Sequence, residues 1–268
     1  MKKRLILALT LLLFTPALFA QQNKIDSLIN LLKTDKADTT KLIHLCSITD
    51  ESETIGNYSD GIKYGNQSIV LADAIIKSNN NEIILRTVKK YKAKVLNYIG
   101  LIYSNQGNYP EALRHYLSSL KIREALGDKK GIAYCYNNIG NVYYLQENYT
   151  EALKNHFASL KIREELGDKK AMAWSYNNIG VVYTDQGNYS AALKNHFASL
   201  KIKKSISDIV GIAACYNNIT QISCQQGNYP EALKNQLASL EIFEEIGDKL
   251  GIAGAYENLA EINLKLNK

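Results

Sequence analysis

The chain has 268 residues and a formal net charge of +6, with 46% hydrophobic and 22% charged side chains. This composition indicates a folded globular protein. Three of the 32 basic residues lie in a segment that we expect to be removed, which lowers the excess over the 26 acidic residues to +3. So small an excess over this length gives no support to nucleic-acid binding, and we expect none.

Residues 1–20 have the pattern of a secretory signal peptide. A basic start from Lys2 to Arg4 precedes an apolar run, and the small residue Ala20 marks the expected cleavage site. The alternative is an uncleaved membrane anchor, but the run is shorter than the roughly 20 residues of a spanning helix and Pro16 interrupts it. We therefore expect an exported protein, periplasmic or extracellular, with no membrane span in the mature chain.

Helical patterns begin directly after this segment. Apolar residues at helical spacing predict a capping helix in 21–36. Two further helices, Asp35–Glu53 and Asp60–Lys77, are predicted on either side of a turn at Gly56. We interpret residues 37–81 as a degenerate first repeat.

Four regular repeats follow, each marked by the same residues. Tyrosines stand 40 positions apart at Tyr109, Tyr149, Tyr189 and Tyr229, and alanines do so at Ala112, Ala152, Ala192 and Ala232. The predicted repeats are 82–130, 131–170, 171–210 and 211–250, and a single capping helix is expected over 251–268. Repeat 82–130 opens with a long helix, which is predicted over Glu82–Gln106. A period of this length is typical of helix pairs that stack on their neighbours.

The repeat 131–170 shows how each pair is built. Its apolar residues recur at spacings of 3, 4, 7, 10 and 11, which is one face of an α-helix. Gly140 lies within this face, and a glycine inside a helix costs about 1 kcal/mol relative to alanine. Its recurrence at Gly100 and Gly180 indicates close approach of the partner helix. Phe157, on the second helix, is predicted to be buried.

The ends of the helices carry local signals. Thr150 and Ser190 are predicted to be N-cap residues of second helices, because short hydroxyl side chains accept hydrogen bonds from free backbone N–H groups. Gly167 is predicted to end its helix in the left-handed conformation, and Asp168 to begin the next helix.

The four cysteines are predicted to be free and largely buried thiols. They are Cys46, Cys135, Cys215 and Cys224. Cys135 and Cys215 occupy the same place two repeats apart, and Cys215 and Cys224 lie on opposite sides of one predicted helix, so neither pair reaches disulfide distance. Paired Cys and His spacings typical of zinc sites are lacking in the sequence. We expect no metal and no cofactor.

The signature of the repeats resembles the tetratricopeptide repeat. It is carried by Tyr136, Ile139, Gly140, Tyr143, Tyr149 and Ala152. The 40-residue period is similar to the long variety in Pins-type adaptor proteins and kinesin light chains. The resemblance covers about Ala37 to the end and is specific over Lys92–Gly247, with Thr220 and Ser223 departing from the pattern. It implies an all-α fold, a right-handed α-α superhelix of antiparallel helix pairs, whose concave wall binds a peptide of a protein partner.

A second stripe on the first helices, opposite the core, predicts a peptide-binding groove. Its residues are Asn97, Tyr98, Tyr134, Asn137, Asn138, Asn141, Trp174, Asn177, Asn178, Asn217, Asn218 and Asn258. An asparagine amide offers an acceptor and two donors, which match the C=O and N–H groups of a peptide, and the aromatic rings offer apolar anchors. The alternative is that these asparagines bond between repeats or face water, and that one of each pair is structural.

Two further sets of residues received both a functional and a structural interpretation. His156 and His196 occupy equivalent positions, and no carboxylate or cysteine accompanies them, so we interpret them as hydrogen-bonded core histidines rather than a metal or catalytic pair. Basic rows run along the second helices, at Arg114, Lys154, Lys194 and Lys234 and at Lys121, Lys161 and Lys201. We interpret these rows as a solvated outer face, with contact to an anionic surface as the alternative.

The motifs of common enzyme classes are missing from the sequence: a nucleophile elbow, a phosphate loop, paired catalytic carboxylates and a zinc motif. We therefore expect no enzyme and predict no catalytic residue. The predicted function is a non-catalytic scaffold that binds a peptide segment of a partner. The alternative is an exported sensory or input module whose kinase, cyclase or DNA-binding output lies elsewhere. Self-association through the C-terminal helix is a third hypothesis.

Overall fold

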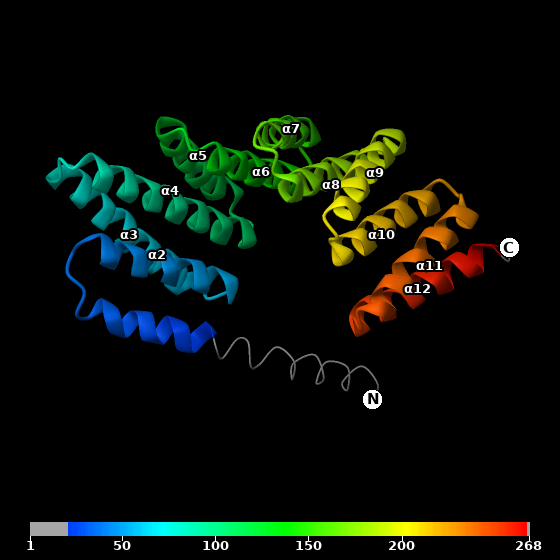
Figure 1. Ribbon diagram of the computed structural model, residues 1–268, viewed down its shortest axis with the longest axis horizontal. Coiled ribbons are helices and arrows are strands. Elements are labelled where there is room, and N and C mark those ends of the chain that lie inside the picture. The colour runs from blue at the N-terminus through cyan, green and yellow to red at the C-terminus, as the bar shows by residue number, and fades with distance from the viewer. Residues whose placement is uncertain (1–20, 267–268) are drawn as a thin grey trace. The chain divides into compact units, whose positions relative to one another are not determined.

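The structure is a computed structural model that describes residues 21–266, and within this range it contains helices and no strand (Figure 1). Residues 21–32 are helical. The helices that follow are α2 (Thr39–Thr54), α3 (Tyr58–Ser78), α4 (Glu82–Asn105), α5 (Tyr109–Leu126), α6 (Lys129–Leu145), α7 (Tyr149–Glu165), α8 (Lys169–Asp185), α9 (Tyr189–Ser205), α10 (Ile209–Gln225), α11 (Tyr229–Glu245) and α12 (Lys249–Leu266). The all-α prediction is confirmed, and the long helix expected after the first repeat is α4.

The chain divides into two compact units, one up to Asn138 and one from Ile139 onward, so that α6 contributes to both. In the first unit, α2 packs on α3 and α4 on α5, and α4 also contacts α2 and α3. In the second unit, α8 packs on α9 and α10 on α11, while α7 contacts α8 and α12 contacts α11. Short turns join the helices of each pair, which therefore run antiparallel (Figure 1).

Small side chains let the paired helices approach. The alanines that mark the period, Ala112, Ala152, Ala192 and Ala232, are all fully buried. A Cβ atom on Gly140 would lie 2.8 Å from the ring of His156, and one on Gly180 would lie 2.7 Å from the ring of His196. The close approach predicted from these glycines is confirmed.

The helix ends correct one prediction and confirm another. Thr150 and Ser190 are not N-caps, because α7 and α9 begin one residue before them. Asparagines take that place, at Asn108, Asn148, Asn188 and Asn228, and each accepts a bond from the backbone N–H three residues ahead. Gly167 has the predicted left-handed backbone, with φ 63°, and Asp168 caps α8.

The prediction that Phe157 is buried is wrong, because its side chain is 43% exposed. The buried face of α7 contains His156, Ser159 and Leu160, and Phe157 is turned about 100° from His156 around the helix. All four cysteines are free as predicted, although Cys224 is only half-buried.

Between residues 21 and 266, no helix has the length and hydrophobicity needed to cross a membrane. The predicted signal peptide lies outside the described residues.

Candidate binding site

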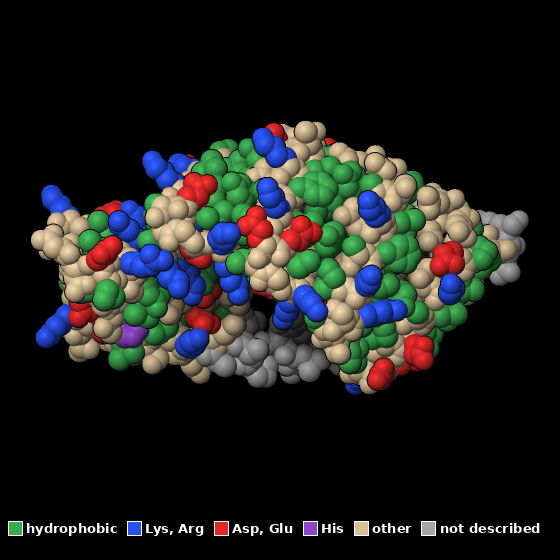
Figure 2. All heavy atoms as spheres, turned by 45° about the horizontal axis from the view of Figure 1, so that its top comes forward, with side chains coloured by type: hydrophobic (Ala, Val, Ile, Leu, Met, Phe, Trp, Pro, Cys, Tyr) green, Lys and Arg blue, Asp and Glu red, His purple; other side chains and the backbone are tan. Residues whose placement is uncertain are grey.

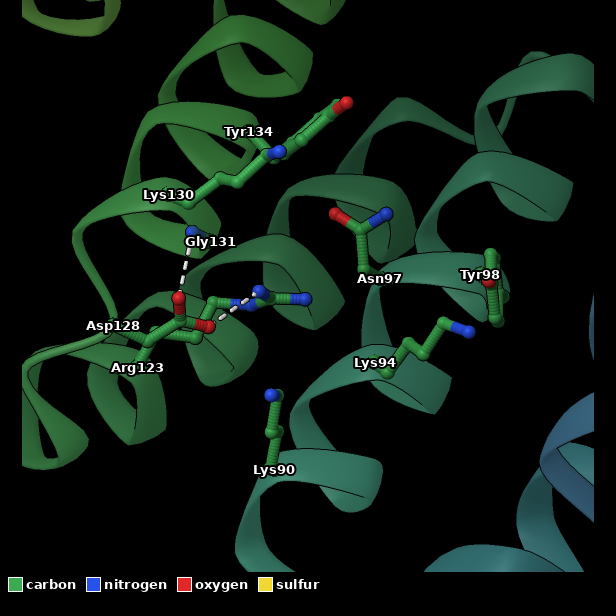
Figure 3. Close-up of a pocket in the computed structure, with 9 residues that line it drawn as sticks. All are labelled: Lys90, Lys94, Asn97, Tyr98, Arg123, Asp128, Lys130, Gly131 and Tyr134. Carbon is green, nitrogen blue, oxygen red and sulfur yellow. Dashed lines mark hydrogen bonds and ion pairs between the residues drawn. The ribbon is translucent and has the colours of Figure 1, made fainter. Parts of the chain in front are cut away.

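The first unit contains a basic pocket of about 480 Å³ between α4, the end of α5 and the start of α6 (Figure 3). It is lined by Lys90, Lys94, Asn97, Tyr98, Arg123, Asp128, Lys130, Gly131 and Tyr134. Four of these side chains are cationic and only one is a carboxylate. We refer to this set of residues as the basic pocket.

The single carboxylate of the basic pocket is already engaged within the protein. Asp128 caps α6, and its Oδ1 accepts a bond from the Gly131 backbone nitrogen at 3.0 Å. Its Oδ2 accepts from Arg123 Nη1 at 2.9 Å, while Arg123 Nε donates to Ser119 Oγ at 3.1 Å. A Cβ atom on Gly131 would meet the Arg123 guanidinium and Asp128 Oδ2, so this ion pair occupies the space beside the glycine. The lining thus has three more cationic side chains than carboxylates.

Two tyrosines of the basic pocket supply apolar surface beside these cations. The Tyr98 hydroxyl donates a hydrogen bond to Asp50 Oδ2 at 2.6 Å, which fixes the ring. Burial of Tyr98, together with this bond to a carboxylate, raises the pKa of its hydroxyl. Lys94 Nζ lies 5.4 Å from the centre of that ring, a cation–π distance. Tyr134 is 41% exposed. The pocket can therefore hold an anionic group and an adjacent apolar group.

The predicted groove asparagines bond to one another along the repeats. Asn138 Nδ2 donates to Asn97 Oδ1 at 3.1 Å, and Asn218 Nδ2 donates to Asn177 Oδ1 at 2.8 Å. The second asparagine of one repeat thus bonds to the first asparagine of the preceding repeat. Such bonds between repeats are the structural role that the sequence left open.

Gln236 replaces a direct asparagine pair at the C-terminal end of this ladder. This residue is fully buried, and its Nε2 donates to Asn217 Oδ1 at 3.2 Å. Its Oε1 accepts a bond from Asn258 Nδ2 at 3.3 Å. Asn217 and Asn258 also line a pocket of about 260 Å³ with Thr220, Gln221, Cys224, Gln225, Glu261 and Ile262.

The remaining groove residues do not share one cavity. Trp174 is 43% exposed, and Lys170 Nζ lies 5.5 Å from its ring centre. Asn218 lines a pocket of about 150 Å³ with Tyr144, Val181, Thr184, Asp185, His196 and Gln221. In that pocket the Tyr144 hydroxyl donates to Asp185 Oδ2 at 2.6 Å, a bond that raises the pKa of Tyr144 to about 12. Asn137, Asn141 and Asn178 are half-buried on the same helix faces.

The basic pocket contains three predicted residues, Asn97, Tyr98 and Tyr134, and six that the sequence did not reveal. The missed residues are Lys90, Lys94, Arg123, Asp128, Lys130 and Gly131. One signal was available, because Lys94 occupies the position of Tyr134 and Trp174 in the following repeats. Lys90 lies one helical turn before Lys94 in α4, and the other missed residues lie at the end of α5, in the turn after it and at the start of α6.

His156 and His196 lie in the core, each 1% exposed, as predicted. Burial lowers the pKa of each imidazole to about 4, and the neighbouring charges of Arg163 and Lys203 act in the same direction. The predicted hydrogen bond is not found at Nδ1, which is buried and unpaired in both rings among the described residues. No group of three or more His, Cys, Asp or Glu residues within 21–266 is arranged to hold a metal ion.

Comparison with known proteins identifies the repeats. Residues 91–165 and 132–205 match one family model of the tetratricopeptide repeat, and residues 212–246 match another. These matches span more than half of the chain, which therefore belongs to the tetratricopeptide-repeat proteins. No curated protein matches the chain with significance.

Solved structures share the fold at low sequence identity. BtubC from P. vanneervenii is 14% identical with a TM-score of 0.69, and the alignment covers 86% of this chain and 91% of BtubC. A signal-transduction ATPase with a tetratricopeptide-repeat sensor from Pyrococcus horikoshii is 18% identical with a TM-score of 0.70, over 82% of this chain and 32% of that protein. A Rap protein complexed with Competence and Sporulation Factor is 18% identical with a TM-score of 0.61, and the alignment covers 93% of this chain and 72% of the Rap protein.

Proposed function

We propose that this protein is a non-catalytic interaction scaffold that binds an acidic peptide segment of a partner protein. The observation that carries the proposal is the basic pocket, where four cationic side chains and two tyrosines surround about 480 Å³. Two comparisons support it: the chain consists of tetratricopeptide repeats, and a Rap protein of similar fold was solved in complex with a partner factor.

The charge of the basic pocket decides the chemistry of the segment. Asp128 is the only carboxylate in the lining, and the Arg123 guanidinium and the α6 backbone already engage it. Lys90, Lys94 and Lys130 therefore favour a ligand that brings its own negative charge. Tyr98 and Tyr134 provide apolar surface for a neighbouring side chain of the same ligand.

The asparagine ladder supports an extended backbone as the bound form. In the pair of Asn177 and Asn218, one donor–acceptor contact joins the side chains. The Nδ2 of Asn177 and the Oδ1 of Asn218 make no hydrogen bond with residues 21–266. In this pair one amide nitrogen and one amide oxygen can thus serve the C=O and N–H groups of a peptide.

The direct test is titration of a fluorescent peptide that alternates glutamate with leucine. The double variant Lys90→Glu/Lys94→Glu reverses two charges of the pocket, and we expect at least about tenfold weaker binding, since charged contacts at an interface commonly contribute 1–3 kcal/mol. The control is Lys154→Glu/Lys161→Glu, which makes the same charge change on exposed residues of α7. Equal affinity of both double variants would refute the basic pocket as the binding site.

The ladder is tested separately with Asn177→Ala and Asn217→Ala. Both side chains lie outside the basic pocket, and their loss is expected to weaken a long peptide more than a short acidic one. A loss of binding in these variants, combined with no effect of Lys90→Glu/Lys94→Glu, would retain the scaffold and reject the acidic ligand.

Export is the second part of the proposal, and it rests on the pattern of residues 1–20. The test is expression of the full chain, followed by cell fractionation and mass measurement of the intact product. A product that begins at Gln21 outside the cytoplasm supports cleavage. A full-length product in the cytoplasmic fraction would reject it.

A sensory or input module is the second candidate function. It is supported by the similar fold of the ATPase from Pyrococcus horikoshii, which is described as having a tetratricopeptide-repeat sensor and of which this chain spans about a third. Crosslinking in cells followed by mass spectrometry distinguishes the two functions. Recovery of a membrane kinase or cyclase favours the module, and recovery of a protein with an exposed acidic segment favours the scaffold.

A further inference from the structure

Helix α9 differs in charge from the equivalent helices of the other repeats. It carries four lysines and no acidic residue, whereas α7 contains Glu151, Glu164 and Glu165. The residues at those three positions in α9 are Ala191, Lys204 and Ser205. The acids that neutralise the lysines of the other repeats are therefore lost in this repeat alone.

The lysines of α9 flank an exposed phenylalanine. Lys194, Phe197, Lys201 and Lys204 recur at spacings of 3, 7 and 10, which places them on one face of the helix. Phe197 is 49% exposed, and the three lysines are exposed as well. In Figure 2, which brings the side of α7 and α9 forward, lysine and arginine side chains stand among hydrophobic ones. We refer to these four residues as the α9 face.

The junction after α9 shows a second departure. Ile209 and Val210 begin α10 and are 43% and 59% exposed. The preceding repeats place lysine pairs there, Lys129 with Lys130 and Lys169 with Lys170. Two exposed β-branched side chains thus replace two cations at the start of the helix that follows α9 in the chain. Repeat 171–210 therefore has fewer acidic residues and more exposed apolar surface than the preceding repeats. These two independent changes favour a partner that combines negative charge with an apolar region.

We propose that the α9 face and the adjacent Ile209 and Val210 bind the surface of an anionic lipid bilayer. Exposed lysines attract anionic headgroups, and aromatic and aliphatic side chains enter the boundary between headgroups and acyl chains. A bilayer requires no cavity, and none of the three pockets described above includes a residue of the α9 face. The next helix of the same kind, α11, carries Glu241, Glu244 and Glu245, so the acid-free lysine row of α9 does not continue onto α11.

The test is co-sedimentation with vesicles, using residues 21–268 of the protein. Vesicles of equal parts phosphatidylcholine and phosphatidylglycerol are expected to bind the protein, and vesicles of phosphatidylcholine alone are not. The variant Ala191→Glu/Lys204→Glu/Ser205→Glu installs the residues that α7 has at these positions, so a similar helix already tolerates them. We expect it to bind the mixed vesicles about tenfold more weakly or worse.

Two controls separate this surface from others. Lys154→Glu/Lys161→Glu makes the same change in net charge on α7 and is expected to retain vesicle binding. Lys90→Glu/Lys94→Glu, which alters the basic pocket, is expected to retain it too, so the lipid proposal stands or fails apart from the peptide proposal. Equal loss in all three variants would show that net charge alone governs binding and would overturn the assignment to α9.

The apolar contribution is tested with Ile209→Lys/Val210→Lys, which restores the lysine pair of the preceding repeat. This variant adds positive charge and removes the apolar side chains, and we expect weaker vesicle binding. Stronger binding would overturn the insertion of these side chains. Binding of soluble polyglutamate to the α9 face, with no binding to mixed vesicles, would show that an acidic protein is the partner and would overturn the proposal.

Discussion

Gly140 and Gly180 lie where a buried histidine ring meets the neighbouring helix, and this contact explains why a poor helix former stands at the same position of α6 and α8. The rings of His156 and His196 occupy the space that a Cβ atom would need. Gly254 lies in α12 and has no atom within 4 Å of the place of its Cβ. A Cβ atom would thus clash at position 140 and would have free space at position 254.

Replacing Gly140 by alanine is expected to destabilise the protein by about 1–3 kcal/mol, because overpacking of the histidine ring outweighs the gain in helix propensity. Gly254→Ala is the matched control and should stabilise by up to about 1 kcal/mol, since only the propensity changes. Urea denaturation measures both. A stabilised Gly140→Ala variant would contradict the close contact.

The buried histidines predict a loss of stability in acid. In the folded protein the pKa of His156 and of His196 is about 4, below the ordinary value of 6.5. Between these values the unfolded chain binds more protons, so the stabilisation is complete above about pH 6.5 and is lost as the pH falls towards 4. Each ring contributes up to about 3 kcal/mol to this loss.

Glutamine can replace these histidines without introducing a titratable group, because Gln236 occupies the equivalent position in the last repeat. The variant His156→Gln/His196→Gln is expected to show a flatter dependence of unfolding free energy on pH between about 4 and 6.5. Urea denaturation at several pH values measures it. An unchanged slope would assign the acid sensitivity to other groups.

At the scale of the helices, a left-handed residue follows the second helix of each regular repeat, and it is not always glycine. Gly127, Gly167 and Gly247 have positive φ values, and Ser207 takes the same place with φ 54°. A side chain other than glycine in this conformation costs about 1–2 kcal/mol. The repeat 171–210 therefore carries a strained junction.

Ser207→Gly is expected to raise the free energy of unfolding by about 1 kcal/mol, because glycine adopts this backbone without a Cβ clash. The reverse change, Gly167→Ser, should lower it by a similar amount. Thermal denaturation followed by circular dichroism compares the two variants. Effects of the same sign in both would argue against backbone strain as the cause.

At the scale of the whole chain, each repeat contacts only its neighbours, so stability is close to a sum over repeats and the interfaces between them. Removing residues 171–210 takes out one full period and joins Lys170 to Gly211 at equivalent positions. The shortened chain is expected to keep its helical signal per residue and to unfold at lower denaturant concentration. The control deletion, 171–190, removes half a period and is expected to abolish cooperative unfolding.

The helices and their core faces followed from the sequence, because the helical spacing of apolar residues and the 40-residue period are local properties. Gly140, Gly167 and Asp168 were assigned correctly, since each depends on backbone conformation or on the helix packed directly against it. The prediction for Phe157 was wrong because this residue directly follows His156 on α7 and lies about 100° further around the helix. The helix packs through the side that carries His156.

The basic pocket could be located only from the tertiary structure. Lys90, Arg123 and Lys130 come from three helices. Lys90 and Lys130 are one 40-residue period apart, but this spacing does not show that the three side chains line one cavity. They meet because the angle between packed helices brings the ends of α5 and α6 beside the middle of α4 (Figure 3). The asparagine stripe was visible in the sequence, but its bonding between repeats was not, because an amide that bonds to the next repeat and one that faces a ligand occupy the same place on a helix.

The sequence by itself determined the tetratricopeptide repeats and the pairing of their helices, because a pattern repeated every 40 residues can bury its apolar faces only by stacking. Only the tertiary structure decided where cations outnumber carboxylates in a cavity and which side chains are exposed. Those properties depend on distances between residues far apart in the chain, and such distances are set by side-chain packing between helices.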